Sequence, residues 1–231
     1  MTLNAIWTAI QDHSDIYKNQ TLLEMFSADP HRVSKLTIDA SPLNFDFSKT
    51  HLSDQIISLF ADLYEARQFS NARDALFDGQ ALNVSESRPV LHAALRGSFA
   101  PEVAADGSPV SSFITYELTK LRSFVSQVHE EQHFKHVLHL GIGGSALGPE
   151  MVVEALKHLG SKMDVHVVSN VDGAALASLL PTLDAEHTLV IIASKTFTTL
   201  ETLMNADTVV HWLKSAGIEN PKDQMIAATA N

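Results

Sequence analysis

Residues 136–149 read HVLHLGIGGSALGP. The first five residues predict a short β-strand that ends at Gly141. Glycines permit positive φ angles and let backbone N–H groups approach a ligand closely. A helix beginning near Leu147 or Pro149 would direct its N-terminal N–H groups at the same place. The stretch therefore predicts a strand, an anion-binding loop and a helix, and phosphate is the expected anion. The alternative is a tight turn in which the glycines serve packing only.

Strand and helix patterns alternate through the rest of the chain. The apolar run 189–193 shows no polar alternation, which is typical of a strand buried on both faces. The alternation predicts an α/β fold with a doubly wound parallel sheet. A flavodoxin-like strand order, 2-1-3-4-5, would place the first and third strands side by side. We expect further strands at 165–168, 189–193 and 225–229, and helices at 114–128, 151–159, 174–180 and 198–216.

The N-terminal part has a different pattern, which predicts a mainly helical segment over residues 1–111. Its last part, 97–111, is rich in Gly, Pro, Ser and Ala and is expected to be a loop before the α/β domain, 112–231. The chain stops two residues after a predicted strand, so we expect the domain to be truncated and the chain to be a piece of a longer protein. Three runs carry a helical pattern: 56–64, which follows the expected N-cap Ser53, 71–76 and 89–96. Residues 36–47 alternate and predict a short antiparallel pair around Ser41-Pro42.

A second polar cluster, SKTFTT at 194–199, follows the third predicted strand. Hydroxyl groups and helix N-terminal amides donate hydrogen bonds to phosphate oxygens, and lysine adds a positive charge. Thr198 with Glu201 also fits a helix capping box. Because the first and third strands are expected to be neighbours, their loops would meet at one phosphate pocket. The six residues of this predicted pocket are Gly144, Ser145, Ser194, Lys195, Thr196 and Thr199.

Two other motifs point to different chemistry. Residues 141–146 also match G-x-G-x-x-G/A, the fingerprint of a dinucleotide-binding Rossmann oxidoreductase. That fingerprint needs an acidic residue about 20 positions on, at the end of the second strand; Asp164 opens that strand instead, and Asp172 lies further along the chain. Residues 129–133 match H-E-x-x-H, a zinc motif when both histidines share a helix face. The surrounding segment is polar, so a solvated helix end is the favoured interpretation, and we expect no metal.

Composition narrows the classes of partner. The chain has 231 residues, of which 45% are hydrophobic, and its net charge is −11. An acidic surface disfavours nucleic acid and anionic membranes as partners. The chain has no cysteine, which suits a reducing cytoplasm. We expect neither a signal peptide nor a membrane span.

Four segments resemble signatures of the glucose-6-phosphate isomerase family, in family order between positions 83 and 202. Residues 141–149 match Gly-Ile-Gly-Gly-Ser-Asp-Leu-Gly-Pro with Ala146 in place of Asp. Residues 169–173, SNVDG, and 194–202, SKTFTTLET, match intact. Upstream, 83–96 is similar to Asn-x-Thr-Glu-x-Arg-Ala-Val-Leu-His-x-Ala-Leu-Arg.

The resemblance implies the first of two sugar isomerase (SIS) domains after a helical segment. The activity that the resemblance implies is the interconversion of glucose 6-phosphate and fructose 6-phosphate through an enediol, without a cofactor. This reaction belongs to glycolysis and gluconeogenesis. It assigns the six pocket residues to the sugar-phosphate side. It also implies that the glutamate base, the ring-opening histidine and lysine, and the enediol-binding arginine lie beyond Asn231. We therefore expect no catalytic residue in this chain, weak substrate binding without turnover, and a homodimer when the protein is full length.

Two related classes of protein would have a similar phosphate pocket. A non-catalytic sugar-phosphate-sensing SIS module would normally carry a basic DNA-binding helix pair, and residues 1–111 show no basic stripe. An amino-sugar phosphate isomerase would not match residues 194–202. Ala146 removes a carboxylate beside the glycine loop, which leaves open how the loop's hydrogen bonds are made.

Overall fold

The computed structural model describes residues 1–97, 101–104 and 107–230. The chain divides into two compact units, residues 1–118 and 119–231. The division falls inside helix α6 (Ser111–Glu131). The expected domain boundary, between residues 111 and 112, lies at the first turn of the same helix and stays a prediction. The expected loop 97–111 lies partly outside the described residues, at 98–100 and 105–106.

The first unit is mainly helical and carries one small hairpin. Helices α1 and α4 pack against each other. Ser53 caps α4 as expected, since its hydroxyl accepts a hydrogen bond from the Ile56 amide at 3.3 Å. The predicted antiparallel pair is confirmed as β1 and β2. The elements are α1 (Leu3–Tyr17), α2 (Leu22–Ala28), α3 (Arg32–Lys35), β1 (Thr37–Ala40), β2 (Leu43–Asp46), α4 (Asp54–Ala66), α5 (Phe69–Phe77) and η1 (Ala94–Arg96).

A buried arginine ties the loop between β2 and α4 to α3. Arg32 is only 4% exposed. Its guanidinium group donates hydrogen bonds to the carbonyl oxygens of Ser48, Thr50 and Leu52. A planar group with five N–H donors suits this task, because it satisfies several backbone acceptors from one side chain.

The helix expected at 89–96 is wrong. Only the 3₁₀ turn Ala94–Arg96 forms there. Ala94 is buried with Ala104 and Val110, whereas Leu95 is 57% exposed. The segment is therefore anchored through Ala94, with Leu91 partly buried against the same cluster, and does not present a helical apolar face.

The second unit contains the predicted parallel sheet. Its strand order is β4-β3-β5-β6 and every pairing is parallel. In chain order this is 2-1-3-4, as the flavodoxin-like arrangement requires. The elements are β3 (His136–Leu140), α7 (Gly144–Leu156), η2 (Lys157–Leu159), β4 (Asp164–Val168), α8 (Gly173–Leu179), η3 (Leu180–Thr182), β5 (Thr188–Ala193), α9 (Leu200–Ser215), η4 (Pro221–Gln224) and β6 (Met225–Ala228).

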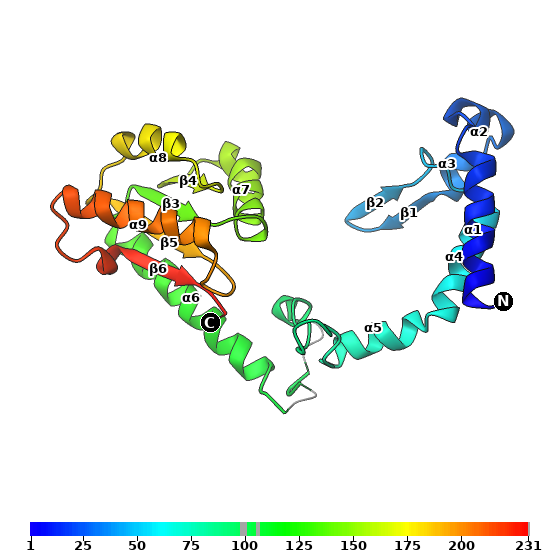
Figure 1. Ribbon diagram of the computed structural model, residues 1–231, viewed down its shortest axis with the longest axis horizontal. Coiled ribbons are helices and arrows are strands. Elements are labelled where there is room, and N and C mark those ends of the chain that lie inside the picture. The colour runs from blue at the N-terminus through cyan, green and yellow to red at the C-terminus, as the bar shows by residue number, and fades with distance from the viewer. Residues whose placement is uncertain (98–100, 105–106, 231) are drawn as a thin grey trace. The chain divides into compact units, whose positions relative to one another are not determined.

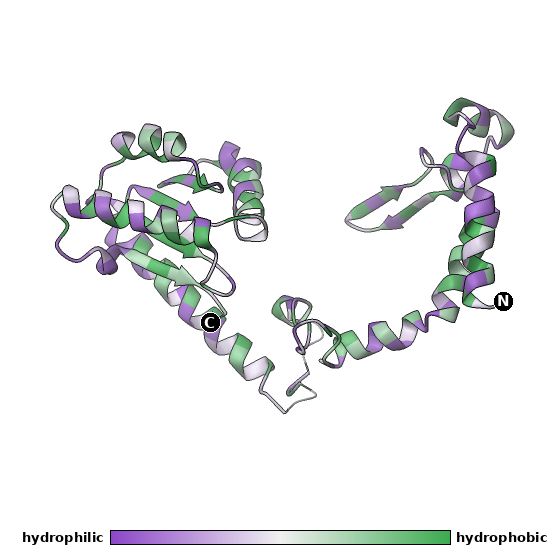
Figure 2. Ribbon diagram, in the orientation of Figure 1, coloured by the Kyte–Doolittle hydropathy of each residue, from purple (hydrophilic) through white to green (hydrophobic). Residues whose placement is uncertain are grey.

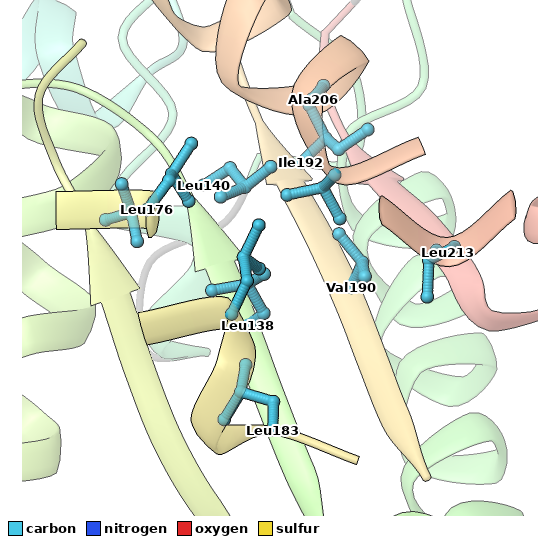
Figure 3. Packing of buried hydrophobic residues seen from close by; sticks show 11 residues of the cluster. Leu138, Leu140, Leu176, Leu183, Val190, Ile192, Ala206 and Leu213 are labelled. Atoms are coloured by element: carbon cyan, nitrogen blue, oxygen red, sulfur yellow. The ribbon is translucent and has the colours of Figure 1, made fainter. Parts of the chain in front are cut away.

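One apolar core holds α8 and α9 against the sheet. Leu138, Leu140 and Val190 are fully buried between these helices and the strands (Figure 3). Figure 2 shows hydrophobic and hydrophilic residues alternating along the same helices, and Leu176, Val209 and Leu213 are the ones that enter the core. Residues 119–131 of α6 pass behind the sheet (Figure 1). Helices on both faces make the sheet doubly wound.

Two details of the helices differ from expectation. Helix α7 begins at Gly144, before the expected start near Leu147 or Pro149 and before the expected helical stretch 151–159, and its N-cap Gly143 has a φ of 56°. The capping box at Thr198 is wrong: Thr199 is the N-cap of α9, and the Thr198 hydroxyl lies 2.6 Å from the Thr196 hydroxyl. No helix within the described residues is long and apolar enough to cross a membrane.

Candidate phosphate-binding site

Two loops leave the sheet at the same edge. β3 and β5 are hydrogen-bonded neighbours with Leu140 opposite Ile192, so the loops that follow, 141–143 and 194–199, start level and about 5 Å apart. The carboxyl edge of a parallel sheet is the usual ligand-binding edge of this fold. All six residues of the predicted pocket lie in these loops or at the first residues of α7 and α9: Gly144, Ser145, Ser194, Lys195, Thr196 and Thr199.

The first loop forms a tight turn into α7. The Ser145 amide donates to the Ile142 carbonyl at 3.1 Å, and the Ala146 amide donates to the Gly143 carbonyl at 3.0 Å. The amides of Gly143 and Gly144 donate no hydrogen bond to any described residue. Unused amides at a helix N-terminus are donors for an anion.

A histidine fastens this turn to the strand before it. His139 is 7% exposed, and its Nε2 lies 2.7 Å from the Ser145 carbonyl oxygen. Gly141 lies against the same carbonyl: a Cβ there would sit 2.6 Å from the oxygen. Ala146 is fully buried, so a carboxylate at this position would be enclosed.

The second loop is held from inside by Ser194. This serine is 3% exposed. Its hydroxyl donates to Thr199 Oγ1 at 3.2 Å and accepts from the Phe197 amide at 3.1 Å. Phe197 has a positive φ of 56°, an unusual conformation for a bulky residue, and its ring packs on the apolar core of the sheet. Ser194 and Phe197 together fix the shape of the loop.

The remaining residues of the second loop face solvent. Lys195 and Thr196 are exposed, and Thr199 is half-buried. The Lys195 carbonyl accepts from the Ala230 amide at 3.0 Å, which joins the loop to the segment after β6. The loop thus places a positive charge, two hydroxyl groups and the N-terminus of α9 at the carboxyl edge of the sheet.

A third loop is attached to α9 at this edge. The Asn205 side-chain amide donates to the Asn170 carbonyl at 2.9 Å, and Asn205 is 3% exposed. Asp172 accepts from the Ala174 amide at 2.9 Å and so caps α8. Sequence reasoning missed the positioning roles of His139, Phe197 and Asn205, since no local motif marks them.

The two alternative motifs lack the geometry that they need. Asp164 lies at the amino end of β4, opposite the glycine loop, and Asp172 serves as a helix cap, so neither stands where a dinucleotide ribose would require it. Helix α6 ends at Glu131 and Gln132 has a φ of 50°. His133 therefore lies outside the helix, and the two histidines of 129–133 do not share a helix face. Within the described residues, no group of three His, Asp or Glu side chains is placed to hold a metal ion.

The neighbouring strands β3 and β4 carry a histidine pair. The rings of His136 and His166 have centroids 5.9 Å apart. Burial lowers the pKa of His166, and the neighbouring His136 lowers it further, while Asp164 acts in the opposite direction. His136 begins β3 and His166 lies in the middle of β4, opposite Leu138, so neither belongs to the loops of the predicted pocket.

Comparisons with known proteins agree with the geometry. The family model for phosphoglucose isomerase matches residues 46–231. A glucose-6-phosphate isomerase from Rhizorhabdus wittichii is 42% identical over 228 residues, covering 98% of this chain and 43% of that protein. One from Zymomonas mobilis is 39% identical over 231 residues, with 99% and 43% covered.

A solved structure has the same fold over nearly the whole chain. The crystal structure of a glucose-6-phosphate isomerase from Chlamydia trachomatis matches with a TM-score of 0.80 and 25% identity, covering 97% of this chain and 44% of that one. This chain thus spans less than half the length of these relatives. With the family model matching most of its residues, the chain belongs to the phosphoglucose isomerase family.

Proposed function

We propose that this chain carries the sugar-phosphate-binding part of a glucose-6-phosphate isomerase. The observation that supports this most is the meeting of two polar loops at the carboxyl ends of β3 and β5. Each loop leads into a helix N-terminus, and one of them carries Lys195. A dianionic phosphate ester suits such an edge, because helix N-termini and lysine both favour negative charge.

The pocket residues have different roles in this proposal. The amide of Gly144 and the hydroxyl of Ser145 lie on the α7 side; the side chains of Lys195, Thr196 and Thr199 lie on the α9 side. Ser194 is buried and its hydroxyl already makes two hydrogen bonds. It therefore acts by holding Thr199 and the loop in place.

The proposed reaction interconverts glucose 6-phosphate and fructose 6-phosphate through an enediol. Opening the ring and moving a proton between C1 and C2 both need an acid or a base close to those carbons. Five of the pocket residues supply donors and a charge, which hold the phosphate and orient the sugar, while Ser194 holds the loop. We therefore propose that the 231-residue chain binds substrate weakly and does not turn it over.

The same proposal implies a pathway, a cellular compartment and partners for the protein. The protein would act in glycolysis and gluconeogenesis in the cytoplasm, which the lack of cysteine suits. Its partner would be a small sugar phosphate, and the net charge of −11 disfavours nucleic acid. A homodimer is proposed for the full-length protein only.

Titration of the chain with fructose 6-phosphate, followed by amide NMR, tests the proposal. Shifts are expected at Gly144, Ser145, Thr196 and Thr199, and NAD should produce none. Lys195→Gln should weaken binding by about tenfold, the order expected for a charge-assisted contact. Lys162→Gln is the matched control, because it removes the same charge from an exposed position just before β4, at the other edge.

Three results would contradict the proposal. Shifts caused by NAD but not by the sugar phosphate would favour a dinucleotide site. An equal loss of affinity in both lysine variants would mean that only net charge matters. Measurable isomerisation by the purified chain, in an assay coupled to glucose 6-phosphate oxidation, would show that it contains a working base.

A further inference from the structure

We propose that His139 is a positioning residue of the phosphate site: its imidazole replaces the hydrogen bond that Pro149 removes from the first turn of α7. The inference rests on the proposed phosphate-binding function, since it explains how the Gly144–Ser145 end of the pocket is held.

The need for an outside donor comes from the helix itself. In an α-helix, the carbonyl of residue i accepts from the amide of residue i+4. For Ser145 that partner is Pro149, which lies inside α7 and has no N–H group. A proline ring also crowds the carbonyl four residues before it. The Ser145 carbonyl therefore lacks its regular α-helical donor.

His139 supplies the missing donor from β3. Its Nε2 lies 2.7 Å from the Ser145 oxygen. A carbonyl oxygen can only accept, so Nε2 carries the hydrogen in this contact. The side chain is 7% exposed, which keeps water from competing for the same oxygen.

Gly141 leaves the space in which this contact forms. A Cβ at Gly141 would sit 2.6 Å from the Ser145 oxygen and 3.2 Å from His139 Nε2. His139 of β3 and Gly141 of the turn thus both lie against the Ser145 carbonyl group of α7. The peptide that bears this carbonyl also carries the Ala146 amide, which closes the turn onto Gly143 at 3.0 Å.

The hydrogen bond from His139 also affects the amides in the first turn of α7, on the side where the phosphate is proposed to bind. The amides of Gly144 and Ser145 belong to the two peptide units before the held carbonyl. If that carbonyl is released, the first turn of α7 can rotate, and its amides lose their common direction. Phosphate affinity should therefore depend on a side chain that does not touch the phosphate.

A set of four variants tests this. His139→Leu removes the donor; His139→Gln keeps an N–H donor of similar reach; Pro149→Ala restores the backbone donor. The fourth, His139→Leu with Pro149→Ala, should recover what His139→Leu loses. The readouts are the Kd for fructose 6-phosphate and the carbonyl ¹³C shift of Ser145, which reports its hydrogen bond.

We expect His139→Leu to raise the Kd by about tenfold, as one unmade buried hydrogen bond would. His139→Gln and the double variant should both lie within about threefold of the unchanged chain, and the Ser145 shift should follow the same order. A purely structural role for His139 would not be rescued by a change at position 149. An unchanged Kd in folded His139→Leu, or a double variant as weak as His139→Leu, would overturn the inference.

The carbonyl shift separates this inference from the proposed function. If the unchanged chain does not bind fructose 6-phosphate, the proposed function fails, while the Ser145 shift still decides the role of His139. A shift that moves in His139→Leu and returns in the double variant supports it, and one that does not move refutes it. If His139→Leu does not fold, folding of the double variant supports the rescue and its failure to fold counts against it.

Discussion

The hydroxyl of Ser194 lies 3.2 Å from that of Thr199, across the base of the loop that joins β5 to α9. The same hydroxyl accepts the Phe197 amide at 3.1 Å. The buried hydroxyl of Ser194 thus orients Thr199, which is proposed to bind the phosphate, and closes the turn of the loop by accepting the Phe197 amide. Lys195 and Thr196 are exposed and follow Ser194 in the loop, so these two hydrogen bonds hold them in place.

Replacing Ser194 by alanine should therefore damage the loop more than replacing an exposed hydroxyl. We expect Ser194→Ala to lower the free energy of unfolding by about 1–3 kcal/mol, because the Phe197 amide loses its partner. Urea denaturation followed by circular dichroism gives that value. Thr198→Ala is the control, since among the described residues its exposed hydroxyl has Thr196 as its one hydrogen-bond partner; an equal loss in both variants would refute the special role of Ser194.

Two glycines near α7 should respond to alanine in opposite directions. At Gly141, a Cβ would lie 2.6 Å from a backbone oxygen, so Gly141→Ala should destabilise the protein by about 1–3 kcal/mol. At Gly148, inside the helix, a Cβ would meet nothing within 4 Å, and alanine should stabilise by about 0.5–1 kcal/mol. Thermal melting of both variants tests the pair. A Gly141→Ala protein as stable as the unchanged chain would contradict the close approach.

Acid should weaken the fold through His166. Burial lowers the pKa of this imidazole from its ordinary value of 6.5, and His136 lowers it further. As the pH falls below about 6.5, the unfolded chain takes up the proton before the folded chain does, so stability falls. The part of stability contributed by neutral His166 is present above that pH and is lost as the pH drops toward its folded-state pKa.

Urea midpoints at a series of pH values between 7.5 and 5 would measure this effect. His166→Leu should flatten the profile in that range, whereas His129→Leu, at an exposed position of α6, should leave its slope unchanged. Equal slopes in the unchanged chain and in His166→Leu would exclude this source of acid sensitivity.

The buried Arg32 offers a test in the first unit. Arg32→Met keeps the apolar stem but leaves the carbonyls of Ser48, Thr50 and Leu52 without their donor. We expect a loss of about 3 kcal/mol or more. Arg73→Met breaks only an exposed ion pair with Asp74 and should cost less than about 1 kcal/mol. Denaturation of the two variants under one condition compares them, and similar losses would show that the three carbonyls find water instead.

The sheet and its order were predictable because each strand has a strong local signal. The run 189–193 is apolar throughout, and Gly141 marks where β3 ends. The two loops of the predicted pocket come directly after strands, so their convergence followed from the strand order alone. The helix predicted at 89–96 failed because its spacing resembles an amphipathic helix while only Ala94 is buried in the small cluster there.

Other features depended on contacts that no short window contains. The bond from His139 to Ser145 joins a strand to a helix and is needed because of a proline four residues further on. Thr198 failed as a cap because its hydroxyl is engaged by Thr196 and the helix begins one residue later than expected. Asn205 reaches a carbonyl 35 residues earlier in the chain, which sequence periodicity does not reveal.

The placement of Phe197 has a consequence for motion. Its ring packs on the core beneath the sheet, although the residue sits in the middle of an exposed loop. To open, the loop must withdraw that ring from the core, which exposes apolar surface to water. Hydrogen exchange at the Phe197 amide should therefore be slow and should follow the unfolding of the sheet, while the tip of the loop remains free to exchange quickly.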